Sequence, residues 1–108
     1  MARLIEAGDA ESVFVSSISV WEVARLVQRQ RLELTMPVTE WLRQAEALTA
    51  VRFAPVDNRI AVRSVLLPPP LHSDPADRII IATALHLQAT LITKDRKLRD
   101  YPHVAARW

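Results

Sequence analysis

The sequence predicts an α/β domain built on a mainly parallel sheet. Short strand-like runs alternate with helical patterns, several of these runs are apolar without alternation, and the helix that opens at residue 75 is apolar almost all round. Strands of that kind are buried on both faces, as in a parallel sheet covered by helices. With 108 residues, the chain is expected to form a single domain.

The composition excludes several kinds of site. The chain has only one glycine, so it cannot form a glycine-rich phosphate loop. The lack of cysteine rules out disulfides, thiol catalysis and cysteine-based zinc sites. A cysteine-free chain also fits a cytoplasmic protein. No apolar run approaches the roughly 20 residues that span a bilayer, so no membrane partner is predicted. The net charge of +2 is too small to predict nucleic-acid binding by itself.

The first third of the chain is expected to alternate helix, strand and helix. Residues 2–7 predict a helix that Gly8 ends, and residues 12–16 (SVFVS) predict a short strand. Ser19, with Glu22 three residues later, forms a capping-box pattern that opens the next helix.

The middle and the end of the chain continue this alternation. Pro37 opens a helix to about residue 49, and residues 51–56 predict a strand. Asp57 is expected to cap the following helix, and residues 67–73 form a proline-rich loop. Residues 104–108 predict an edge strand.

The most informative stretch is LHSDPADRIIIATALHLQATLITKDRKL. Asp74 suits the N-cap of a buried helix, Pro75 its first position, and Asp77 its first turn, where the helix dipole favours negative charge. Residues 90–93 predict a buried strand, and Asp95 follows it. Sites in α/β sheets form at helix starts and strand ends, and three carboxylates gathered there would suit a hard divalent cation.

Each of these acids also has a purely structural interpretation. Glu22 completes a capping box, Asp74 is an N-cap, Asp77 stabilises a helix dipole, and Asp95 is a turn residue after a strand. Two tryptophans, Trp21 and Trp41, are interpreted as core or interface anchors. The three histidines lack metal-binding spacing and are interpreted as loop or surface residues: His72, His86 and His103.

Four blocks in order, FVSSISVWEVARL, RLEL, LHSDPADRIIIATAL and LITKDRKL, resemble PIN-domain ribonucleases, in particular the toxin half of VapBC toxin–antitoxin pairs. The resemblance implies a PIN-like three-layer α/β/α fold and a toxin that hydrolyses RNA phosphodiester bonds with Mg²⁺ or Mn²⁺. It also implies a cytoplasmic location, a cognate antitoxin protein as partner and a homodimer.

The resemblance assigns roles by motif position. Glu22, Asp77 and Asp95 match the catalytic acids, which are also the metal ligands. Asp74 matches an additional acid, with a mainly structural role and a weaker contribution to metal binding. Mg²⁺ and Mn²⁺ prefer oxygen ligands, so carboxylates are the expected residue type. Three further residues are predicted substrate contacts: Ser17, Thr93 and Arg78.

The chain departs from the family at its beginning. Family members start with a short apolar strand that ends in an aspartate and lies in the middle of the sheet. No such strand precedes the FVSS block, so residues 1–108 are predicted to form an N-terminally incomplete PIN-like domain. The neighbouring strands, at residues 13–15 and 91–93, would then have unpaired edges, which predicts a homodimer or a strand-swapped oligomer.

Two functions of different kinds follow from the sequence. The first is an active metal-dependent endoribonuclease toxin. The second is a catalytically impaired PIN remnant that binds an antitoxin or RNA without cleaving it. A third reading is another carboxylate-based phosphoesterase, such as a structure-specific DNA nuclease.

Overall fold

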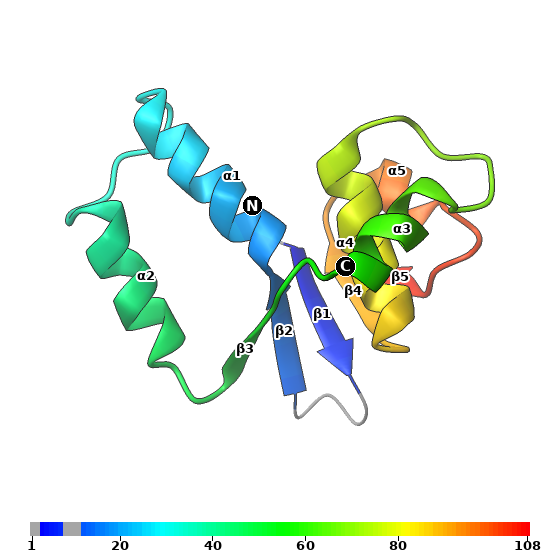
Figure 1. Cartoon of the computed structure of the whole chain (residues 1–108), viewed down its shortest axis with the longest axis horizontal. Coiled ribbons are helices and arrows are strands. Elements are labelled where there is room, and N and C mark those ends of the chain that lie inside the picture. Colours follow the sequence, from blue (N-terminus) through cyan, green and yellow to red (C-terminus); the bar gives the residue numbers. More distant parts are fainter. Residues whose placement is uncertain (1–2, 8–11) are drawn as a thin grey trace.

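A five-stranded mixed sheet lies at the centre of the computed structural model, which describes residues 3–7 and 12–108 (Figure 1). The strands are β1 (Arg3–Ala7), β2 (Ser12–Ser16), β3 (Val51–Ala54), β4 (Thr90–Thr93) and β5 (Ala106–Arg107). Their order across the sheet is β3-β2-β1-β4-β5. β2 is parallel to β3 and β4 is parallel to β5, whereas β1 runs antiparallel to both of its neighbours. The predicted α/β class with a mainly parallel sheet is confirmed.

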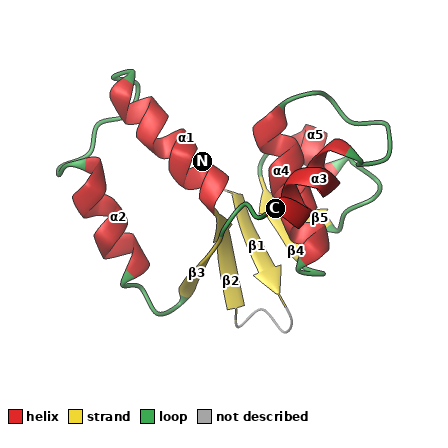
Figure 2. Ribbon diagram, in the orientation of Figure 1, coloured by secondary structure: helices red, strands yellow, loops and turns green. Residues whose placement is uncertain are grey.

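Helices lie on both sides of this sheet. They are α1 (Ser17–Gln28), α2 (Val38–Glu46), α3 (Asn58–Val65), α4 (Pro75–His86) and α5 (Arg96–Arg99). Figure 2 shows α1 and α2 on one side of the strands and α3, α4 and α5 on the other, as expected for three layers. None of the helices in the described part of the chain is long and apolar enough to cross a membrane.

The predicted helix over residues 2–7 is wrong, because residues 3–7 form the central strand β1. Ile5 stands opposite Phe14 of β2 on one side and Leu91 of β4 on the other. The predicted unpaired edges of β2 and β4 are therefore wrong as well, and with them the stated reason for a strand-swapped oligomer. Gly8, expected to end the helix, lies outside the described residues.

The core lies between α4 and the sheet. Ile80, Ile81 and Ala84 of α4 are at most 1% exposed, and they pack in one cluster with Ile5 and Leu91. Helix α4, whose sequence is largely apolar, is therefore buried on most of its surface, as predicted.

The predicted caps of two helices are confirmed. Asp57 accepts a hydrogen bond from the backbone nitrogen of Ile60 at 2.9 Å, and Asp74 accepts one from that of Asp77 at 3.0 Å. Helix α2 follows Pro37 but ends at Glu46, before the predicted position, and Leu48 beyond it is 58% exposed.

Candidate active site

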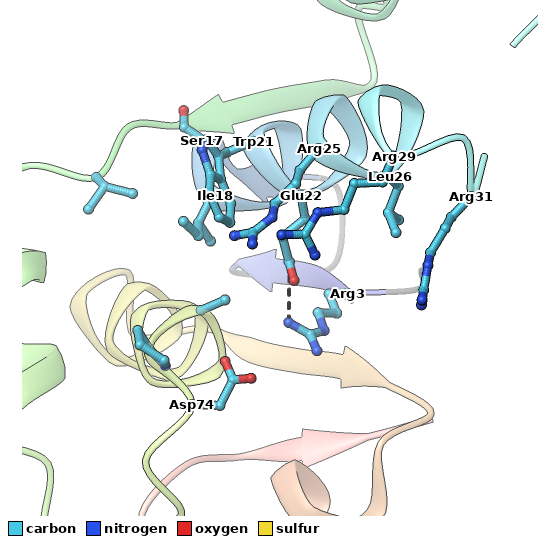
Figure 3. A pocket seen from close by; sticks show the side chains of 13 residues that line it. Arg3, Ser17, Ile18, Trp21, Glu22, Arg25, Leu26, Arg29, Arg31 and Asp74 are labelled. Carbon is cyan, nitrogen blue, oxygen red and sulfur yellow. Dashed lines mark hydrogen bonds and ion pairs between the residues drawn. The ribbon is translucent and has the colours of Figure 1, made fainter. Parts of the chain in front are cut away.

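A cleft of about 820 Å³ opens between α1 and the start of α4 (Figure 3). Arg3 and Glu22 lie at its base, and Asp74 lies on the α4 side. Apolar side chains line much of the rest, together with three arginines of α1 and of the turn that follows it, so the cleft combines carboxylates with basic groups. These arginines are Arg25, Arg29 and Arg31.

Glu22 reaches the cleft because α1 starts earlier than the capping-box pattern predicted. Ser16 is the N-cap, and its hydroxyl accepts a hydrogen bond from the backbone nitrogen of Ile18 at 3.2 Å. Ser19 lies inside the helix, buried, and its hydroxyl has no hydrogen-bond partner among the described residues. The capping box of Ser19 and Glu22 is therefore wrong, and Glu22, one turn into the helix, points into the cleft instead.

Asp77 is the most buried acid of the site, with 5% of its surface exposed. The N-cap at Asp74 fixes the first turn of α4 and so fixes the position of this carboxylate. Its Oδ2 lies 2.6 Å from Nε2 of His72, and its Oδ1 lies 2.7 Å from Nη2 of Arg3. No hydrogen bond is directed at Oδ1 within the described part of the chain, so charge attraction to Arg3 alone holds this oxygen.

Arg3 joins the two acids that come from opposite sides of the sheet. Its Nη1 lies 3.4 Å from Oε1 of Glu22 on α1, and its Nη2 contacts Asp77 on α4. Because β1 is antiparallel, Arg3 stands opposite Thr93, the last residue of β4. The guanidinium of Arg3 thus lies at the edge of the sheet where the parallel strands end. Sites in α/β folds form at this edge.

Burial raises the pKa of Glu22 above its ordinary value of 4.5. The positive charge of Arg3 opposes this increase, and the negative charges of Asp77 and Asp74 add to it. Since the carboxylates repel one another across the cleft even with Arg3 present, the site favours the binding of positive charge.

Asp95 lies apart from this group in its contacts. It caps the short helix α5, and its Oδ1 accepts a hydrogen bond from the backbone nitrogen of Lys97 at 2.9 Å. It does not line the cleft, unlike Glu22 and Asp74. The structure thus shows the structural role that its position after a strand suggested, and a catalytic role stays a prediction from the resemblance.

The three predicted substrate contacts differ in their positions. Ser17, the first residue of α1, lines the cleft. Thr93 is 1% exposed, and its hydroxyl accepts a hydrogen bond from the backbone nitrogen of Asp95. Each of the three guanidinium nitrogens of Arg78 donates to a backbone carbonyl, which ties α4 to the end of α3 and to the loop before α4. These contacts give Thr93 and Arg78 structural roles, and substrate contact by either stays a prediction.

Sequence reasoning missed two members of the site. His72 was interpreted as a loop or surface residue, and it does lie in a loop, but its ring contacts Asp77. Its position five residues before Asp77, in the same block, was the only available signal. Arg3 fell within the segment that was predicted to be a helix, where no side chain was expected to reach the acids.

The arrangement described here does not fit a bound divalent cation. Carboxylate oxygens are the ligands that Mg²⁺ and Mn²⁺ prefer. However, the described residues contain no group of three His, Asp or Glu side chains that could hold a metal ion. The guanidinium of Arg3 also engages one oxygen of Glu22 and one oxygen of Asp77.

The fold and the paired acids at the open edge of the sheet define an α/β protein with a carboxylate-based site, and the comparisons identify its class. A PIN-domain family model matches residues 1–104, and the chain belongs to this family. It is similar to Ribonuclease VapC22 of Mycobacterium tuberculosis (strain ATCC 25618 / H37Rv), with 41% identity over 95 residues, which cover 87% of this chain and 71% of that protein. No solved structure matches the chain. The resemblance to PIN-domain proteins of the VapC type is confirmed.

Proposed function

We propose that this protein is a ribonuclease that hydrolyses RNA phosphodiester bonds, with Glu22 and Asp77 as its reacting carboxylates. One observation carries the proposal: Glu22 lines a cleft that is also lined by several arginines, and one of these, Arg3, joins Glu22 to the buried carboxylate of Asp77. The similarity to a protein named as a ribonuclease supports the same conclusion.

The walls of the cleft suit single-stranded RNA. Trp21 is 52% exposed, and the guanidinium of Arg25 lies 5.0 Å from the centre of its ring. An exposed indole can stack on an unpaired base, and neighbouring arginines can contact the phosphates on either side of it. The helix face that carries Trp21, Arg25 and Arg29 would thus bind the strand and bring one phosphate near Glu22.

The finer parts of the proposal follow from the family resemblance. Mg²⁺ or Mn²⁺ is the proposed cofactor, because the donor type is right even though the present arrangement of the acids is not. A cognate antitoxin is the proposed protein partner, and a homodimer the proposed assembly. The cytoplasm, where RNA is plentiful and a cysteine-free chain is ordinary, is the proposed location.

A second function is favoured by the contacts of Arg3. A guanidinium between Glu22 and Asp77 neutralises part of the charge that a reaction centre needs. A PIN-family protein with such a site could bind RNA or an antitoxin without cleaving RNA.

Cleavage of a labelled single-stranded RNA separates these two functions. The expected result is cleavage by the 108-residue chain at millimolar Mn²⁺, lost with EDTA and reduced roughly 100-fold or more in Asp77→Asn, since removing a single charge-stabilising group commonly costs that much. The matched control is Asp100→Asn, a change at an exposed aspartate at the end of α5, which should cleave like the unmodified chain.

Binding is measured on the same RNA by gel shift at several salt concentrations. Salt-dependent binding without cleavage by a folded chain would contradict the ribonuclease proposal and support the binding module. Cleavage that Asp77→Asn leaves unchanged would remove this acid from the reaction centre. Circular dichroism confirms folding, because Asp77 is buried and its loss also breaks two contacts.

A further inference from the structure

The guanidinium of Arg3 occupies the position that a cation would take in this site. Its nitrogens lie 2.7 Å from Asp77 and 3.4 Å from Glu22, and its side chain is only 17% exposed. Among the described ion pairs, it alone joins acids that come from two different helices. The exposed pair of Arg107 with Glu6, by contrast, joins one cation to one acid.

A divalent ion would need the same oxygen atoms. Arg3 engages Oδ1 of Asp77, His72 engages Oδ2, and Arg3 also contacts Oε1 of Glu22. Bringing a second cation into this space would place two positive charges side by side in a partly buried site, at a large electrostatic cost. Arg3 and a metal ion therefore exclude each other.

We infer that Arg3 is a built-in counter-ion that closes the carboxylate site to divalent metal ions, and that metal binding requires its side chain to withdraw. The inference concerns the site of the proposed function and rests on that proposal only for the reaction that follows metal binding. On this inference, the replacement of the Arg3 guanidinium by a divalent metal ion is the step that controls whether the site is occupied by metal.

Only the side chain needs to move. β1 is paired on both sides, and Ile5 is 1% exposed in the core, so the strand itself is firmly held. Arg3 is the first residue of β1, with its charged group at the edge of the sheet and beside the open cleft. Rotation about its side-chain bonds would free both acids without breaking the sheet.

Mn²⁺ binding to four forms of the full chain tests the inference, with isothermal titration calorimetry and electron paramagnetic resonance as readouts. The forms are the unmodified chain, Arg3→Gln, Arg3→Gln combined with Asp77→Asn, and Arg107→Gln. We expect Arg3→Gln to bind Mn²⁺ about 10-fold or more tightly than the unmodified chain, because a close like charge has been removed. The double variant should lose this gain, and Arg107→Gln, with the same change of charge outside the site, should bind like the unmodified chain.

Equal Mn²⁺ affinity of the unmodified chain and Arg3→Gln would overturn the inference, as would a gain that Arg107→Gln shares. If Arg3→Gln fails to fold by circular dichroism, Arg3→Lys provides the test: it keeps the charge and should bind Mn²⁺ no more tightly than the unmodified chain. A tighter Arg3→Lys would then overturn the inference.

RNA cleavage by the same forms separates this inference from the proposed function. Tight Mn²⁺ binding by Arg3→Gln without cleavage would leave the counter-ion role intact and contradict the ribonuclease. If the unmodified chain cleaves RNA and binds Mn²⁺ as tightly as Arg3→Gln, the ribonuclease is supported and the counter-ion role of Arg3 is contradicted.

Discussion

Helices α1 and α4 have the same length of 12 residues but very different surroundings. Six residues of α4 are buried, including five consecutive ones from Ile80 to Ala84, whereas the only buried residue of α1 is Ser19. Helix α4 belongs to the core cluster, and α1 leaves Trp21 half exposed beside the cleft. Trp21 was predicted to be a core or an interface anchor; the core role is wrong, and the interface role stays a prediction.

The difference explains how the two acids can serve different purposes. Asp77 is carried by a helix that the core holds in place, so its position is fixed by packing and by the cap at Asp74. Glu22 is carried by a helix whose other side chains are half-buried or exposed, apart from Ser19, so we expect its position to adjust more easily to what enters the cleft. Arg3 on β1 links the two, and the site therefore depends on the contact between a rigid and a loosely packed part of the molecule.

The largest expected effect on stability comes from truncating a buried side chain of α4, compared with truncating a half-buried one of α1. Ile81→Ala should lower the free energy of unfolding by about 2–5 kcal/mol, because the side chain is fully buried and its loss leaves a cavity. Leu26→Ala, in the half-buried part of α1, should cost only about 1 kcal/mol. Urea denaturation of both variants measures the difference, and equal losses would show that α1 is packed as tightly as α4.

A smaller effect tests how α1 begins. Ser16→Ala removes the N-cap and should lower the free energy of unfolding by about 1 kcal/mol. Ser19→Ala should be neutral or slightly stabilising, because it removes a buried hydroxyl that has no partner among the described residues. The opposite order of stabilities in chemical denaturation would restore the capping box that the sequence suggested.

The smallest effect concerns the charge on α1 and depends on pH. Because burial raises the pKa of Glu22 above 4.5, the folded protein binds this proton more tightly than the unfolded chain does. Ionised Glu22 therefore lowers stability at neutral pH, and this cost disappears as the pH falls below the unfolded value. Glu22→Gln should melt slightly higher than the unmodified chain at neutral pH and at the same temperature below about pH 4.

Thermal melts across this pH range provide the measurement. Glu33→Gln, a change at an exposed glutamate beyond α1, is the control and should show no such convergence. If the difference in melting temperature between Glu22→Gln and the unmodified chain increased on acidification, a raised pKa of Glu22 would not be its cause.

The sequence predicted most reliably the parts whose structure is determined locally or by complete burial. Asp57 and Asp74 were identified as caps because their side chains bond within one turn, and α4 was identified because an almost entirely apolar helix must be buried. Residues 3–7 were assigned wrongly because Arg, Leu, Glu and Ala favour helices when taken alone. A helix of that length is unstable by itself, and the pairing offered by β2 and β4 outweighs its propensity.

The same reasoning explains what could be predicted of the site. Glu22, Asp74 and Asp77 were nominated from motif spacing, and the structure brings them to one region. Asp95 was nominated in the same way, but its contacts are those of a cap. Arg3 could not be nominated, because its place opposite Thr93 depends on a strand pairing that joins the two ends of the domain.

The central position of β1 also has a consequence for synthesis on the ribosome. Ile5 pairs with Phe14, which emerges soon after it, and with Leu91, which emerges near the end of the domain. The hairpin of β1 and β2 can form early, but one edge of β1 has no partner until β4 has been made. β1 therefore keeps one unpaired edge while the residues between β2 and β4 are synthesised, and nascent chains would expose this edge to chaperones or to one another during that time.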